Sequence, residues 1–174
     1  MKKLFTPSII DVEASGFGVA SYPIEVGVIN QSGEKFCKLV KPHTDWQHWD
    51  KQAEDLHGIS RQVLLDKGVP IVQICQELNQ FLSNQIVYSD GWVVDQTWMI
   101  KLFSDARVAM NFTLSPLEMI LKEEQMAVWH VTKDEVCKKM NLKRHRASSD
   151  AALIQSTFVT TQQMIFPPIL EAQG

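Results

Sequence analysis

The stretch Ile9-Ile10-Asp11-Val12-Glu13 decides the expected fold of this 174-residue chain. Its apolar residues are typical of a strand buried in a sheet. Side chains at i and i+2 of a strand lie on the same face, so the two carboxylates should lie side by side. Carboxylates that close repel each other unless a cation lies between them, and hard oxygen ligands favour Mg²⁺ or Mn²⁺. The spacing indicates a metal site or, as the plainer alternative, a strand end with two solvated acids.

Working outward from this strand, the apolar patterns predict a sheet followed by helices. Gly33 marks a hairpin turn between the second and third strands. Further helix starts are predicted at Ser115-Pro116 and at the pair Thr132 and Glu135. The expected strands are 8–12, 23–30, 35–40 and 86–88, and the expected helices are 61–67, 70–82, 92–103 and 147–165. This order predicts an α/β fold with a mixed sheet.

The composition is that of an ordinary globular protein, with 45% hydrophobic residues, 21% charged residues and a net charge of −3. We expect one domain over 1–174, with a core at about 6–165 and a short C-terminal tail at 166–174. No apolar run has the ~20 residues that a membrane helix needs, and no secretory leader is evident. Three separated cysteines without a C-x-x-C pair favour a reduced, cytoplasmic protein with no membrane partner.

Two further motifs carry acids that could join the first pair. Asp95 follows a short strand and a turn, and should lie in the first turns of a helix, where the macrodipole alone would also explain an acid. Asp90, in the same stretch, is the minority candidate. His145 and Asp150 have an H-x₄-D spacing that should bring a loop imidazole and a helical acid together. Histidine can deprotonate water near neutral pH, although a surface loop would have the same spacing.

The order and spacing of these motifs resemble those of the DEDDh exonucleases. This superfamily includes the proofreading subunits of bacterial replicative polymerases, ribonuclease T and oligoribonuclease. The stretch 22–29 resembles the strand that follows the first motif, and His57-Gly58-Ile59-Ser60 resembles a turn of the proofreading-type members. The resemblance covers roughly residues 6–165 and implies a ribonuclease H-like exonuclease fold, with a mixed sheet flanked by helices.

The resemblance also implies a chemistry. It makes His145 the general base and implies two divalent cations, Mg²⁺ or Mn²⁺. The implied reaction is hydrolysis of single-stranded DNA or RNA, or of a 3′ overhang, from the 3′ end, releasing nucleoside 5′-monophosphates. Two such ions would change the formal charge from −3 to +1. The metal ligands implied are Asp11, Glu13, Asp95 and Asp150.

The chain departs from the family pattern in three places, one of which is the segment 42–56, unusually rich in His and Trp. Ala14 stands where the family usually has Thr, and the second motif, 90–95, lacks the usual Asn and Phe. The residues implied to contact substrate are Ala14, Ser15, Gly16, Phe17, His57, Ile59 and Arg146. A basic stretch surrounds His145 and could contact phosphates or simply end a helix; it consists of Lys138, Lys139, Lys143, Arg144 and Arg146.

Partners are expected by analogy alone. Some family members are dimers, so a homodimer is an option for this chain. A polymerase partner is ranked lower, because no polymerase-binding extension is evident after Gly174. The alternative from another class is a non-catalytic nucleic-acid or protein-binding module on the same fold. Trp46 and Trp49 are expected to pack in the interior rather than to stack on a base.

Overall fold

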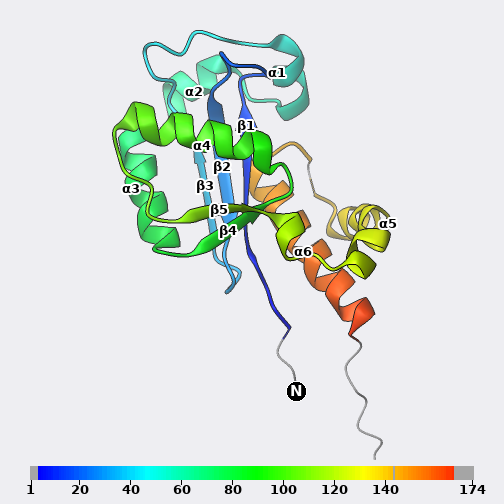
Figure 1. Cartoon of the computed structure of the whole chain (residues 1–174). Coiled ribbons are helices and arrows are strands. Elements are labelled where there is room, and N and C mark those ends of the chain that lie inside the picture. Colours follow the sequence, from blue (N-terminus) through cyan, green and yellow to red (C-terminus); the bar gives the residue numbers. More distant parts are fainter. Residues whose placement is uncertain (1–3, 143, 167–174) are drawn as a thin grey trace, which may run out of the picture.

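The computed structural model describes residues 4–142 and 144–166. A mixed five-stranded sheet forms its centre, in the order β3-β2-β1-β4-β5 (Figure 1). The strands β1, β2 and β3 are antiparallel neighbours, whereas β4 and β5 run parallel to β1. Their bounds are Ser8–Ala14, Pro23–Ile29, Lys35–Leu39, Ile86–Ser89 and Thr113–Pro116. The predicted mixed sheet is confirmed. Lys143 and positions 167–174 of the predicted tail lie outside the described residues.

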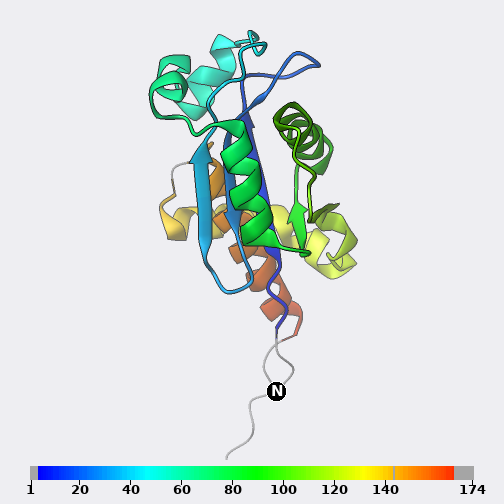
Figure 2. The same cartoon turned by 90° about the vertical axis from the view of Figure 1, so that its left-hand side faces the viewer.

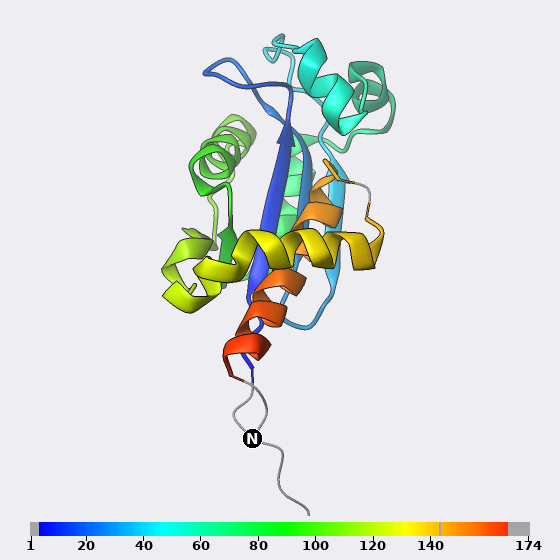
Figure 3. The same cartoon turned by 90° about the vertical axis from the view of Figure 1, so that its right-hand side faces the viewer.

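Helices flank the sheet on both faces. The helices α5 and α6 cover one face (Figure 3), and α3 and α4 lie on the other (Figure 2). The short helices α1 and α2 lie beyond the C-terminal end of β1 (Figure 1). In chain order, α1 to α6 span Lys51–His57, Arg61–Lys67, Ile71–Leu82, Trp92–Ala106, Glu123–Met140 and Ala147–Ile165. Among the described residues, no helix is both long enough and apolar enough to cross a membrane.

The alternation of side chains along β1 divides the interior into two cores. Ile10 and Val12 point toward α3 and α4 and join the larger core. Ile9 points to the other face, where it packs with Ile154 and Phe158 of α6. Asp11 and Glu13 share the face of Ile9, because residues two apart on a strand point the same way. The two acids are therefore directed to the side of the sheet that α6 covers.

Several predicted elements differ from the structure at their ends. Ser115-Pro116 was expected to start a helix, but both residues pair with β4 and belong to β5. Thr132 was expected near a helix start, but it is buried in the middle of α5, against α6. The helix α1 was not predicted. Its cap is local, since the Asp50 side chain accepts a hydrogen bond from the Gln52 backbone amide.

The sheet opens beside the two acids. The parallel pairing of β1 with β4 covers Ser8 and Ile9, whereas β1 remains paired with β2 as far as Ala14. The C-terminal half of β1 is therefore free of β4, and the chain after β4 turns there into α4. This local separation allows a side chain from the start of α4 to reach β1.

Gln155 anchors α6 along the sheet. Its buried side-chain amide donates to the carbonyl of Pro7, at 2.8 Å, and to the carbonyl of Asn30, at 2.9 Å. These carbonyls lie just before β1 and just after β2. One side chain thus holds α6 against both strands at the end remote from Glu13.

We expect Gln155→Met to lower the free energy of unfolding by about 1–3 kcal/mol, because buried carbonyls lose their donor while the side-chain volume is nearly kept. Urea denaturation followed by circular dichroism would measure this loss. The matched control is Gln163→Met, at an exposed position of the same helix. Equal stabilities of the two variants would contradict the anchoring role.

Candidate active site

Three carboxylates meet where β1 faces the start of α6. Asp11 and Glu13 come from β1, and Asp150 comes from the first turn of α6. One carboxylate oxygen from each lies within 4.8 Å of the others. The H-x₄-D motif and the Asp-x-Glu motif, far apart in sequence, are thus brought together as predicted.

Asp95 approaches the same place from the opening between β1 and β4. It is buried in the first turn of α4, outside the group of three. Ser89, at the end of β4, donates its hydroxyl to Asp95 Oδ2, and the Val12 backbone amide also hydrogen-bonds to this carboxylate. The Ser89 hydroxyl in turn accepts a hydrogen bond from the Gly91 amide at 2.9 Å. Sequence reasoning missed Ser89, which holds Asp95 in place.

Asp90 lies at the edge of this group and has a cation of its own. Lys133 of α5 binds Asp90 at 2.6 Å. Among the charges that raise the pKa of Asp11, Asp95 is the largest contributor and Asp90 the smallest. Of the two second-motif acids, Asp95 is therefore the one more closely coupled to β1.

Asp150 is held by its own loop. Arg144 donates its Nε to Asp150 Oδ1 at 2.9 Å, and the backbone amide of His145 donates to Oδ2 at 2.8 Å. His145 has a left-handed backbone, with φ of 60°, which is uncommon for a residue with a side chain and is often found at functional sites. Its imidazole is exposed. The candidate base therefore adjoins the acids through its backbone, with its side chain toward solvent.

Charges are distributed unevenly over the acids of this region. Each outer acid has a cation: Asp90 has Lys133 and Asp150 has Arg144. Among the described residues, Asp11, Glu13 and Asp95 take part in no ion pair. Within the described part of the chain, the central acids thus have no direct ion-pair partner, although Arg144 and Arg146 act on Glu13 from a distance.

The pKa values report the cost of this arrangement. Burial, followed by repulsion from Asp95 and Glu13, raises the pKa of Asp11 well above its ordinary value. Burial and the charge of Asp150 raise the pKa of Glu13 to about 7. Burial also raises the pKa of Asp95, against the lowering effect of the Ser89 hydrogen bond. All three carboxylates would be ionised more easily with a cation among them.

The donor set fits a hard divalent cation. Oxygen atoms of three carboxylates converge, a fourth carboxylate is adjacent, and no ion pair among the described residues involves Asp11, Glu13 or Asp95. Mg²⁺ and Mn²⁺ prefer such carboxylate ligands. The residues present therefore fit a metal centre, with Asp11, Glu13 and Asp150 as its nearest candidate ligands.

A buried acid on the next strand holds the loop that carries His145. Glu25 of β2 is buried and faces Glu13 across the strand pair. Arg146 donates to both of its oxygens, with Nη2 to Oε1 at 2.6 Å and Nε to Oε2 at 3.1 Å. The guanidinium of Arg146, a predicted substrate contact, is thus already bound within the protein. Glu25 could have been noticed as a lone charge in an apolar strand.

The predicted substrate loop, 14–17, borders the group of acids. Ser15 is buried and lies 3.1 Å from the imidazole of His48, and Gly16 passes so close to His48 that no Cβ would fit there. Phe17 is exposed, and its ring centroid lies 6.3 Å from that of Trp98 on α4. The loop therefore presents one exposed aromatic ring beside α4.

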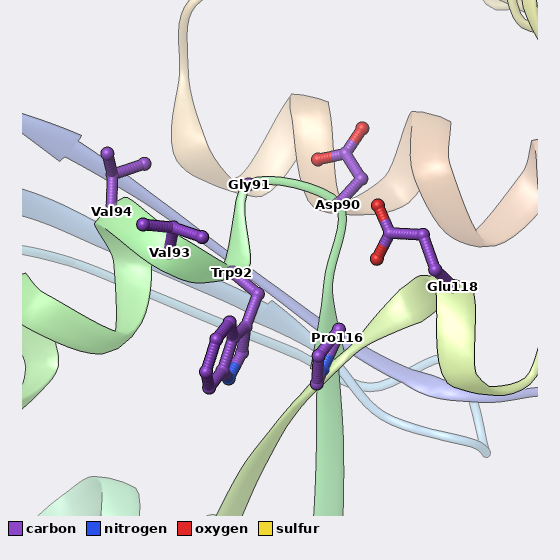
Figure 4. A pocket seen from close by; sticks show the side chains of 7 residues that line it. All are labelled: Asp90, Gly91, Trp92, Val93, Val94, Pro116 and Glu118. Atoms are coloured by element: carbon purple, nitrogen blue, oxygen red, sulfur yellow. The ribbon is translucent and has the colours of Figure 1, made fainter.

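A cavity of about 360 Å³ lies between the start of α4 and the end of β5. Figure 4 shows the Trp92 ring beside Pro116, with the carboxylates of Asp90 and Glu118 near each other above them. The remaining lining residues are Gly91, Val93 and Val94. This cavity combines an aromatic wall with two acids.

The other predicted substrate contacts are interior residues. His57 and Ile59 are buried, and Ile59 packs in the larger core. Trp46 is buried as well and stacks on Tyr22, with ring centroids 5.0 Å apart. The expectation that this tryptophan packs in the interior is confirmed, whereas substrate contact by His57 and Ile59 stays a prediction.

The raised pKa of Glu13 predicts a pH-dependent stability. The folded state binds more protons than the unfolded state between about pH 4.5 and about pH 7, so this group destabilises the fold as pH rises through that range. Glu13→Gln should therefore stabilise the metal-free protein increasingly with pH, by up to about 1.4 kcal/mol per pH unit.

Urea denaturation in EDTA at about pH 5 and about pH 8 would measure the stability difference between wild type and Glu13→Gln. The matched control is Glu135→Gln, at an exposed position of α5. A difference that stays constant with pH, as expected of the control, would show that the pKa of Glu13 is not raised in the folded protein.

Comparisons with known proteins identify the fold. No protein-family model matches the sequence, and no curated protein shows significant similarity to it. The structure is similar to that of exonuclease I, with a TM-score of 0.68 and 14% identity over 93% of this chain and 42% of that chain. E. coli exonuclease I in complex with a dT13 oligonucleotide matches with a TM-score of 0.68 and 15% identity, over 94% of this chain and 42% of that one.

A product-bound structure of exonuclease I also matches, with a TM-score of 0.67 and 15% identity over 94% of this chain and 45% of that chain. The chain spans less than half the length of the exonuclease I chains that it matches. The fold that the resemblance implies is thus confirmed. The order of the five strands and the flanking helices give this chain the ribonuclease H-like exonuclease fold.

Proposed function

We propose that the chain is a metal-dependent 3′–5′ exonuclease that hydrolyses single-stranded nucleic acid. The observation that carries this proposal is the pair of carboxylates on β1 that have no ion-pair partner among the described residues and face Asp150 and the loop of His145. Such a group costs stability in the metal-free protein, so its presence is best explained by cation binding. The fold, which is that of exonuclease I, supports the same reaction class.

In the proposed mechanism, Asp11, Glu13, Asp95 and Asp150 hold two divalent cations. When bound, such ions lower the pKa of a water and neutralise the oxygens of an in-line displacement at phosphorus. His145 accepts the proton of the attacking water through its exposed imidazole. Ser89 and the Val12 amide keep Asp95 oriented toward β1. The products are a nucleoside 5′-monophosphate and a shortened strand.

Single-stranded DNA is the first substrate to test. E. coli exonuclease I has been crystallised with dA16 and dT13 oligonucleotides, and one complex with single-stranded DNA contains zinc. In this chain, the exposed ring of Phe17 beside Trp98 offers a surface on which a base could stack. RNA remains within the proposal, because stacking on an aromatic ring does not depend on the sugar.

The proposed activity predicts a ladder that shortens from the 3′ end of a 5′-labelled single-stranded oligonucleotide in Mg²⁺ or Mn²⁺, and no cleavage in EDTA. Asp11→Asn should lower the rate by about 10³-fold, equivalent to about 4 kcal/mol of transition-state stabilisation. Its fold should persist, because one charge of a repelling group is removed.

Asp134→Asn, at an exposed position of α5, is the matched control and should keep the wild-type rate. DNA and RNA oligonucleotides run in parallel would identify the preferred sugar. If Mn²⁺ stabilises the protein but neither polymer is cleaved, a binding module without catalysis replaces the proposed enzyme.

The proposed metal site also predicts an effect of Arg144. Its guanidinium binds the Oδ1 atom of Asp150, a proposed metal ligand, and so places a positive charge beside the proposed cation. Arg144→Gln should therefore tighten Mn²⁺ binding without nucleic acid by about fivefold, since one unit charge a few ångströms away contributes about 1 kcal/mol at an exposed site. Isothermal titration calorimetry would measure the affinity. Lys139→Gln, at an exposed position of α5, is the control. Unchanged or weaker binding in Arg144→Gln would argue against competition at Asp150.

A further inference from the structure

We infer that Glu25 is a positioning residue, which acts through Arg146 and the start of α6 to hold His145 and Asp150 against the acids of β1. This inference rests on the proposed function for its catalytic consequence. Its structural part, the fixing of one end of α6, rests on the contacts of Glu25 alone.

The buried carboxylate of Glu25 accepts several hydrogen bonds. Only 1% of its surface is exposed. The guanidinium of Arg146 donates to it through Nε and Nη2, and the backbone amide of Ala147 donates to Oε2 at 2.9 Å. Buried charges persist when they are paired and hydrogen-bonded, as this one is. A carboxylate inside the sheet thus holds the backbone at the first residue of α6.

Gly27, two residues further along β2, lets α6 approach the sheet. A Cβ at this position would lie 2.3 Å from the carbonyl carbon of Ala147 and 2.3 Å from the Ser148 nitrogen. No larger residue fits while the helix keeps its place. Glu25 and Gly27 lie on the same face of β2. The hydrogen bond to Glu25 and the close packing against Gly27 therefore both involve the first turn of α6.

The contacts of Glu25 and Gly27 with the start of α6 lie directly beside the proposed metal ligands. Across the strand pair, Glu25 is opposite Glu13 and Gly27 is opposite Asp11. The residues that dock α6 are therefore one strand away from the acids that α6 must face. Because Arg146 and Ala147 lie between His145 and Asp150 in the sequence, holding them fixes both candidate site residues together.

The docking contacts also explain why Arg146 differs from its neighbour Arg144. Arg144 binds Asp150, is more exposed, and could leave when a cation arrives. Arg146 donates hydrogen bonds from two guanidinium nitrogens to the buried carboxylate of Glu25, and such paired donors fix the geometry of the contact. We assign Arg146 to positioning rather than to phosphate binding.

Three variants of the full chain test this inference: Glu25→Gln, Gly27→Ala and Arg146→Lys. Gly27→Ala pushes the start of α6 away without altering any charge, and Arg146→Lys keeps the charge but loses the paired donors. The control is Glu77→Gln, which breaks an ion pair between α3 and β3 in which Glu77 binds Lys38 at 3.2 Å. Each protein is compared in kcat and KM on a 5′-labelled single-stranded DNA, in Mn²⁺ affinity without nucleic acid, and in amide hydrogen exchange.

We expect each test variant to lose about 100-fold in kcat with little change in KM, because misplacement of about 1 Å has this effect on catalysis. Mn²⁺ affinity should fall by about 10-fold or more, as when residues that orient metal ligands are changed. The amides of His145 and Ala147 should exchange faster, whereas Glu77→Gln should match wild type in all three measurements.

The inference would be overturned if the three test variants matched Glu77→Gln in Mn²⁺ affinity and amide exchange. A rise in KM alone for Arg146→Lys would also overturn it, because Arg146 would then be a substrate contact. If Glu25→Gln does not fold, the other two variants, Gly27→Ala and Arg146→Lys, still test the positioning role. If the wild-type protein cleaves no nucleic acid, the proposed function fails, while Mn²⁺ binding and amide exchange still test the positioning role.

Discussion

Mutual repulsion among carboxylates is the constraint on which this structure depends. Asp11 and Glu13 lie on a central strand, where burial already penalises their charge, and Asp95 and Asp150 add negative charge from two helices. A protein selected for stability alone would not gather these groups without a counter-charge. Among the described residues, Lys133 and Arg144 bind the outer acids, and the central ones have no ion-pair partner.

The rest of the architecture keeps these repelling groups together. Two halves of the fold converge on β1: α4 enters through the opening between β1 and β4, and α6 crosses the face that carries Asp11 and Glu13. Each helix is held at its start by contacts that do not involve the acids of β1. Ser89 is placed by the Gly91 amide, and the loop before α6 is bound to Glu25. The electrostatic cost is thus offset by hydrogen bonds formed one strand or one turn away.

The likeness to exonuclease I shows how little sequence identity the fold requires. At 14% identity, the two structures share a fold over 93% of this chain and 42% of that chain. A few positions must be particular residues because nothing larger fits, as at Gly27. Elsewhere, an apolar residue of about the right size serves the core, which is why the fold persists while most residues change.

The sequence by itself determined the elements that depend on local patterns: the alternation of β1, the hairpin at Gly33, the helices 61–67 and 147–165, and the pairing of Asp11 with Glu13 on one face. Tertiary structure alone decided that Thr113–Pro116 pairs with β4, and that the guanidinium of Arg146 turns inward to Glu25. The physical reason is range. Strand and helix periodicity is set by neighbouring residues, whereas these contacts join segments far apart in the sequence. Glu25 and Arg146, for example, are 121 residues apart, and their contact depends on how the whole sheet is covered.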